Sequence, residues 1–175
     1  MDYLQLCCRA LVGVVFTLAV AGKLRGRAEL AAFVDSLGGF GWFAPRVRPW
    51  VAAAVIAVEA VTVVLLALPG TVRAGFVLAA AMLAAFSGGV ALAKARGREV
   101  RCRCFGSDGG LMGRRHQIRN GLLFAVSLLG LPGTAATPRL DLLALAVGAG
   151  VLGAILLAHW DDIVFVLRRP AHHHH

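Results

Sequence analysis

The stretch WVAAAVIAVEAVTVVLLAL, residues Trp50–Leu68, decides the class of fold. It holds nineteen residues, and Glu59 is its one residue with a charged side chain at neutral pH. A helix of that length extends about 28 Å at about 1.5 Å per residue, close to the roughly 30 Å of hydrocarbon in a bilayer. The stretch therefore predicts a transmembrane helix with one acidic side chain inside the membrane.

Four further apolar runs of similar length accompany this one. The chain of 175 residues is 59% hydrophobic, its mean hydropathy is +0.78, and its charges gather between the runs. Soluble domains do not segregate charge in this way. We therefore predict an all-α integral membrane protein of about five transmembrane helices, forming one domain over residues 1–171. The predicted spans are residues 3–22, 50–68, 72–93, 118–136 and 140–160. His172–His175 resemble the remnant of a purification tag.

Lysine and arginine are unevenly distributed over the segments between the runs. Fifteen of the eighteen lie in the first connection, the third connection and the tail, which share one face in a five-span protein. The positive-inside rule assigns that face to the cytoplasm and places the N-terminus outside. The net charge of +9 is therefore a topology signal. A nucleic-acid partner is not expected, because that would need a soluble basic surface with base-stacking aromatics.

The first connection predicts a short helix that lies at the membrane interface. In Ala28–Leu37, apolar residues such as Phe33 recur at helical spacing against polar ones, and the glycines that end at Gly41 then break the pattern. Trp42 and Trp50 follow, and their rings suit the headgroup region. We interpret this segment as an anchored loop without chemistry.

Two thiols stand one residue apart in the third connection, in Cys102-Arg103-Cys104. Neighbouring arginines favour the thiolate, which is the form that attacks a disulfide. A disulfide between residues so close in sequence would be strained and easily reduced. We therefore predict a redox-active pair. Two alternatives stay open: a metal site completed by His116, and two incidental reduced cysteines.

A second pair of thiols, Cys7 and Cys8, lies in the first span. Adjacent residues on a helix point about 100° apart, so at most one of these two thiols faces the centre of a bundle. Packing is the default interpretation, and a secondary redox pair is the alternative.

Glu59 needs a polar partner, because a charge in the middle of a span costs roughly 2.5–3.5 kcal/mol. The candidate partners are Lys23, at the end of the first span, and Arg119, at the start of the fourth. Asn120 extends the same set. We predict that these four residues form a polar cluster that supports the thiols, and the alternative is a purely structural ion pair.

These features together resemble the MauE branch of the MauE/DoxX family over residues 4–135, approximately. The matching elements are Ala21-Gly22-Lys23-Leu24, Glu59, Cys102-x-Cys104-Phe105-Gly106 and Arg119-Asn120. Members more often carry glycine between the two cysteines, so Arg103 is a departure that would change thiol reactivity.

The resemblance implies a bacterial inner-membrane redox protein linked to methylamine utilisation. Its partner would be a thioredoxin-like protein or an exported cysteine-containing protein, and Cys102 and Cys104 would exchange electrons with it, with Phe105 and Gly106 in the motif loop. The family also implies a four-helix-bundle core like that of vitamin K epoxide reductase-type proteins, plus a fifth helix. Through that architecture, quinone is a candidate cofactor.

An exported partner conflicts with the charge bias, which places the cysteine pair on the cytoplasmic face. Three resolutions stay open: the loop dips into the membrane, electrons pass outward from a cytosolic donor, or the topology is inverted. The alternative function is a non-enzymatic scaffold or small-solute carrier with Glu59 in its pathway.

Small residues in the last run predict close helix packing, either within the bundle or between the protomers of a homo-oligomer. They are Gly148, Gly150, Gly153 and Ala154.

Overall fold

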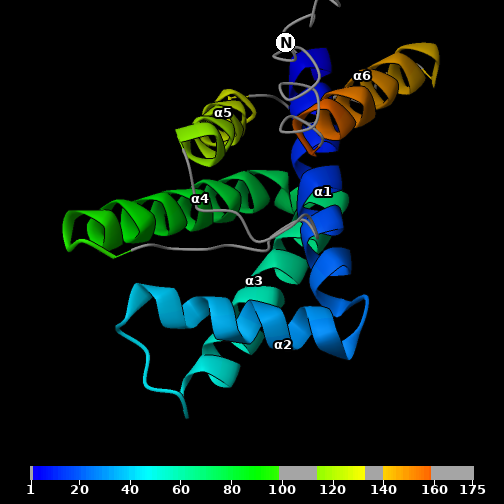
Figure 1. The fold of residues 1–175 in the computed structure, drawn as a ribbon. Helices are drawn as coiled ribbons and strands as arrows, with labels where there is room; N and C mark the ends of the chain where they lie inside the picture. Colours follow the sequence, from blue (N-terminus) through cyan, green and yellow to red (C-terminus); the bar gives the residue numbers. More distant parts are fainter. Residues whose placement is uncertain (1, 99–113, 133–139, 159–175) are drawn as a thin grey trace, which may run out of the picture.

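The computed structural model describes residues 2–98, 114–132 and 140–158, and every regular element in these residues is helical (Figure 1). The elements are α1 (Asp2–Leu24), α2 (Arg27–Ser36), the 3₁₀ turn η1 (Leu37–Phe40), α3 (Arg48–Ala67), the 3₁₀ turn η2 (Pro69–Thr71), α4 (Val72–Ala95), α5 (Arg114–Leu129) and α6 (Leu140–Ala158). The predicted all-α class is confirmed for these residues.

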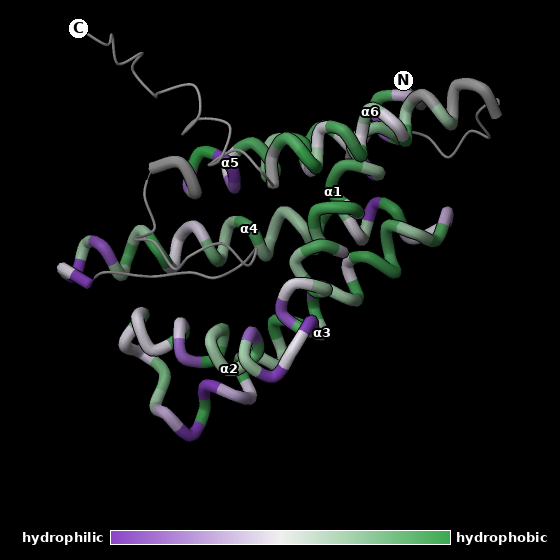
Figure 2. Tube along the Cα trace, turned by 45° about the vertical axis from the view of Figure 1, so that its right-hand side comes forward, coloured by the Kyte–Doolittle hydropathy of each residue, from purple (hydrophilic) through white to green (hydrophobic). Residues whose placement is uncertain are grey.

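Three helical stretches in the described part of the chain are long and apolar enough to cross a membrane. They are Tyr3–Leu24, Arg48–Ala67 and Pro69–Ala95, of 22, 20 and 27 residues. Large apolar side chains on them, such as Trp50 and Val77, are exposed, as expected of helices that face lipid. Figure 2 shows the apolar character running along these helices, with polar residues gathered toward their ends and in the connections. The first three predicted spans are thereby supported.

The last two predicted spans correspond to shorter apolar helical stretches, Gln117–Leu129 in α5 and Ala146–Leu156 in α6. The fourth span was predicted to reach residue 136, whereas α5 ends at Leu129 and a turn follows. Pro132 stands in that turn, and its ring and missing N–H do not fit a continuing helix. The five-span count and the four-helix-bundle core stay predictions.

The short helix predicted in the first connection is present as α2, and it continues into η1; its place at the membrane interface stays a prediction. Phe33, Leu37 and Phe40 point inward and form a second core with α3 and α4. The chain leaves η1 at Gly41, whose φ of 72° lies in the left-handed region that glycine adopts without strain. The α-helix ends at Ser36, just before the glycines, as the sequence predicted; Gly38 and Gly39 then lie in the 3₁₀ turn, and the helical path ends at Gly41.

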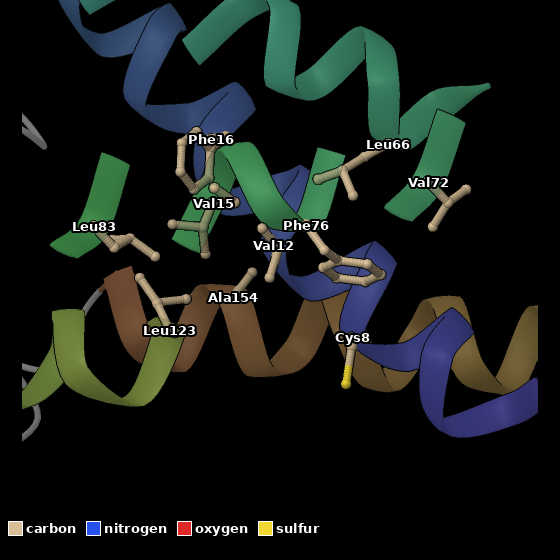
Figure 3. Close-up of a cluster of buried hydrophobic side chains, with 11 residues drawn as sticks. Cys8, Val12, Val15, Phe16, Leu66, Val72, Phe76, Leu83, Leu123 and Ala154 are labelled. Atoms are coloured by element: carbon tan, nitrogen blue, oxygen red, sulfur yellow. The ribbon is translucent and has the colours of Figure 1, made fainter. Parts of the chain in front are cut away.

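The larger core joins five helices around Phe76 of α4 (Figure 3). Val12 of α1, Leu66 of α3, Leu123 of α5 and Ala154 of α6 belong to the same buried cluster. Inside a membrane, such a core is held by van der Waals packing, because lipid tails are as apolar as the side chains. Shape complementarity at these residues therefore fixes how the helices cross.

Arg9 ties the beginning of α1 to the end of α3. Its Nε donates to the carbonyl of Leu66, and its Nη2 donates to the carbonyl of Ala67 at 2.6 Å. The last carbonyls of a helix have no partner within the helix and carry the negative end of its dipole. One guanidinium thus satisfies two of these carbonyls.

Helix α6, which carries the small residues, packs against α1 (Figure 1). A Cβ on Gly150 would lie 2.6 Å from Cβ of Ala10 and 2.9 Å from the backbone nitrogen of Leu11. A Cβ on Gly153 would lie 2.9 Å from the Leu11 side chain. The predicted close helix approach is confirmed within the chain, and its partner is α1.

Replacing Gly150 by alanine should therefore destabilise the protein. The added methyl group meets backbone atoms that cannot rotate away, so Gly150→Ala is expected to lower the free energy of unfolding by about 1–3 kcal/mol. Thermal unfolding in detergent, followed by loss of the monodisperse peak in size-exclusion chromatography, measures the effect.

Gly148→Ala is the matched control, because no atom lies within 4 Å of a Cβ placed on Gly148. It should unfold at the temperature of the parent protein or slightly above it. Equal unfolding temperatures for the two variants would contradict the close α1–α6 contact.

Candidate functional site

A buried ion pair joins the last turn of α1 to the middle of α3. Nζ of Lys23 lies 2.6 Å from Oε1 and 2.8 Å from Oε2 of Glu59, and it also donates to the carbonyl of Ala19 at 3.4 Å. Lys23 is 2% exposed and Glu59 is 7% exposed. Of the two partners proposed for Glu59 from the sequence, the structure thus pairs it with Lys23.

The ammonium group has an aromatic neighbour as well. Nζ of Lys23 stands 5.0 Å from the centre of the Phe33 ring on α2, within the range of a cation–π contact. Helix α2 is therefore part of the surroundings of the ion pair, which its amphipathic pattern alone did not indicate.

Arg119 and Asn120 enter from the first half of α5, and each is 8% exposed. Both line the cavity that Lys23 and Glu59 line. The four residues predicted as a polar cluster from three distant parts of the sequence thus surround one cavity. Whether they support thiol chemistry stays a prediction.

The cavity has a volume of about 300 Å³, and apart from these polar residues its walls are almost entirely apolar. Helices α1, α3, α4 and α5 contribute, together with the first connection. The aromatic residues of the wall are Phe16, Phe33, Phe40, Trp42, Phe43 and Phe86. An apolar chamber with a few convergent polar groups is the usual form of a small-molecule site.

The aromatic wall is the part that sequence reasoning missed. The rings of Phe40, Trp42, Phe43 and Phe86 contact one another with centroids 5.8–6.5 Å apart, mostly edge to face. The interpretation of the first connection as a loop without chemistry treated its rings as membrane anchors. The dense spacing of aromatic residues from Phe33 to Phe43 was the available signal.

The predicted exchanging pair, Cys102 and Cys104, lies outside the described residues, as do Phe105 and Gly106. The alternative metal site uses the same two cysteines and so lies outside them as well. The helices on either side of this segment are described: α4 lines the cavity with Phe86 and α5 lines it with Arg119.

Cys7 and Cys8 make packing contacts. Cys8 is 5% exposed and belongs to the larger core, whereas Sγ of Cys7 donates to the carbonyl of Ala146 on α6 at 3.3 Å. One of the two thiols therefore faces the core and the other faces a neighbouring helix, as the helical geometry predicted. Neither is among the residues that line the cavity.

A family model matches most of the chain. The family model described as methylamine utilisation protein MauE matches residues 1–133, which include helices α1 to α5, the polar cluster and both cysteines of the third connection. No curated protein and no solved structure matches the chain significantly.

Separating the buried ion pair should be costly. Glu59→Leu leaves the ammonium group of Lys23 buried without its carboxylate, so the free energy of unfolding is expected to fall by about 3–5 kcal/mol. Lys23→Met combined with Glu59→Leu replaces both charges by apolar groups of similar size and should recover most of that loss.

Thermal unfolding in detergent measures both variants. Val61→Leu is the control, since Val61 lies on α3 and is 49% exposed. If the double variant unfolds at the temperature of the single one, the loss does not come from the unpaired charge and the pair is not the stabilising contact.

Proposed function

Because the chain belongs to the MauE family of methylamine utilisation proteins, we propose that it is a thiol–disulfide redox protein of the membrane. In this proposal Cys102 and Cys104 alternate between two thiols and a disulfide. The partner is a thioredoxin-like protein or an exported cysteine-containing protein, which undergoes the opposite change. The membrane is the inner membrane of a bacterium, which the chain crosses several times.

One observation carries the proposal: the two helices that flank the cysteine segment both line the cavity that also holds the Lys23–Glu59 ion pair. Phe86 on α4 and Arg119 on α5 both line it. The segment that bears Cys102 and Cys104 begins and ends at these two helices. A bound molecule in the cavity would therefore be held by the same helices that anchor the thiols.

Thiol–disulfide exchange needs no reactant beyond the two cysteines and the disulfide of the partner. The thiolate of one cysteine attacks a partner disulfide and forms a mixed disulfide, and one partner sulfur leaves as a thiolate. The second cysteine then attacks the mixed disulfide and releases the partner as a dithiol. Two electrons pass to the partner, and Cys102 and Cys104 become a disulfide; the reverse sequence oxidises the partner. The arginines adjacent to the thiols in the sequence, Arg101 and Arg103, favour the reactive thiolate.

The cavity also fits the candidate quinone. Its apolar aromatic walls suit a planar lipid-soluble ring. Among the described residues the side chain of Asn120 makes no hydrogen bond, although it is 8% exposed and lines the cavity. That amide would donate to a carbonyl oxygen, and the guanidinium of Arg119 offers further donors. A quinone supplies a two-electron, two-proton acceptor, which matches the oxidation of two thiols to a disulfide.

The first test measures the redox state of the thiols. Purified protein and inverted vesicles are alkylated with a membrane-impermeant thiol reagent, with and without prior reduction, and the product is weighed by mass spectrometry. Prior reduction is expected to add label at both Cys102 and Cys104. Cys102→Ser and Cys104→Ser should each abolish exchange with a thioredoxin-like substrate while the protein still inserts.

Cys7→Ala is the matched control, since its thiol lies against α6 and away from the cavity. It should keep full exchange. Labelling that is the same with and without reduction, together with full activity in both serine variants, would refute the redox proposal. If Glu59→Gln then removed function while the cysteine variants kept it, the carrier alternative would hold.

The second test measures binding of a short-chain benzoquinone in detergent. Trp42 lines the cavity, so quinone binding should quench its fluorescence, and Trp42→Phe should remove that part of the signal. Gly89 lines the cavity, and a Cβ at this position would lie 3.4 Å from the Phe40 ring. The rest of a leucine side chain would extend along the cavity wall. Gly89→Leu is therefore expected to raise the dissociation constant about tenfold or more.

Gly88→Leu provides the control on the neighbouring residue, because nothing lies within 4 Å of a Cβ placed there. It should bind quinone like the parent protein. Equal weakening by both leucines, or quenching that persists in Trp42→Phe, would exclude the cavity as the quinone site.

A further inference from the structure

Three arginines from two segments of the chain lie against the turn that ends η1 or against the residues just after it. Gly41 donates its N–H to the carbonyl of Gly38 at 3.0 Å and closes this turn. Arg48 opens α3, and Arg96 and Arg98 follow the end of α4. We call Arg48, Arg96 and Arg98 the arginine triad.

Each guanidinium of the triad is held on one side by the turn. Nε of Arg48 donates to the carbonyl of Phe43 at 3.2 Å, and its Nη1 would lie 2.8 Å from a Cβ on Gly38. The guanidinium of Arg98 fills the space that a side chain on Gly41 would take. Cζ of Arg96 stands 5.6 Å from the centre of the Trp42 ring. The glycines thus leave room for arginine side chains, and the anchored groups keep other N–H donors for a ligand.

No carboxylate of the described residues neutralises the triad. Within residues 2–98, 114–132 and 140–158, no ion pair joins Arg48, Arg96 or Arg98 to a carboxylate. The carboxylate of Glu29 is turned toward the start of α2, where its Oε2 would lie 2.6 Å from a Cβ on Gly26. Three guanidinium groups without a counter-charge from these residues attract an anion.

We propose that the arginine triad binds the phosphate of an anionic phospholipid head. Guanidinium groups present planar forks of donors that match phosphate oxygens. The triad lies beside Trp42, whose ring is 40% exposed, suits the depth of lipid headgroups and supplies an apolar surface at the start of the acyl chains. A free phosphate ion would not use this apolar surface. The lipid head is therefore the better match.

Native mass spectrometry of the full chain in a neutral detergent tests the proposal, because no charged membrane surface is then present. The probes are phosphatidylglycerol, phosphatidylcholine and inorganic phosphate, each titrated separately. The parent protein is expected to bind one phosphatidylglycerol, at least about tenfold more tightly than phosphatidylcholine, with inorganic phosphate unable to displace it at equal concentration.

Two triple variants carry the same loss of charge. Arg48→Gln, Arg96→Gln and Arg98→Gln together should weaken phosphatidylglycerol binding about tenfold or more. Arg25→Gln, Arg27→Gln and Arg46→Gln together change arginines of the first connection that are outside the triad, and should leave binding within about twofold of the parent. The single variant Arg98→Gln, at an exposed position, gives a smaller loss and serves where the triple variant is poorly folded.

Replacement of the triad by three lysines distinguishes recognition by guanidinium geometry from attraction by positive charge alone. It keeps the three charges and removes the planar pairs of N–H donors. It should bind more weakly than the parent. Binding equal to the parent in the lysine variant, equal losses in both glutamine triples, or displacement of the lipid by inorganic phosphate would each overturn the proposal.

Discussion

The arrangement of helices depends on the contact between Lys23 and Glu59. A carboxylate in the middle of a transmembrane helix cannot remain unpaired without a large cost, so the position of Glu59 constrains whatever packs beside it. Lys23 meets that need from the last turn of α1, and both carboxylate oxygens lie within 2.8 Å of its Nζ. Sliding or rotating α1 against α3 would break this contact. The pair therefore fixes both the register and the facing sides of the two helices.

A second polar tie acts at the opposite end of the same two helices. Arg9, near the start of α1, donates to the last carbonyls of α3. The hydrophobic effect does not drive helices together inside a membrane, so polar contacts and close packing have to specify how they associate. With Arg9 at one end and Lys23 at the other, α1 is held along most of its length. The glycines of α6 then let a further helix approach α1 on another side.

Much of this could be predicted from periodicity and charge placement. The apolar runs gave the helical class, and the isolated position of Glu59 required a partner that Lys23 supplies. The ends of helices were harder to predict. Helix α5 ends at Leu129 because a turn follows, although the apolar run continues beyond it. The cavity could not be predicted, because its wall forms only when Phe33 and Trp42 of the first connection fold back against α3 and α4. Sequence patterns describe one element at a time, and this wall is shared by several.

The buried ion pair in the cavity wall bears on which of the two candidate functions is physically easier. A carrier that used Glu59 to bind a solute cation would have to draw the carboxylate away from Lys23, which leaves a buried ammonium group unpaired and costs several kcal/mol, about 3–5 by analogy with other buried pairs. A two-electron, two-proton change of a neutral ring moves no net charge into the cavity, so the pair can stay intact throughout. Asn120 offers donor and acceptor atoms at the same place without adding charge. On electrostatic grounds the cavity is therefore better suited to the proposed redox function than to the transport of an ion.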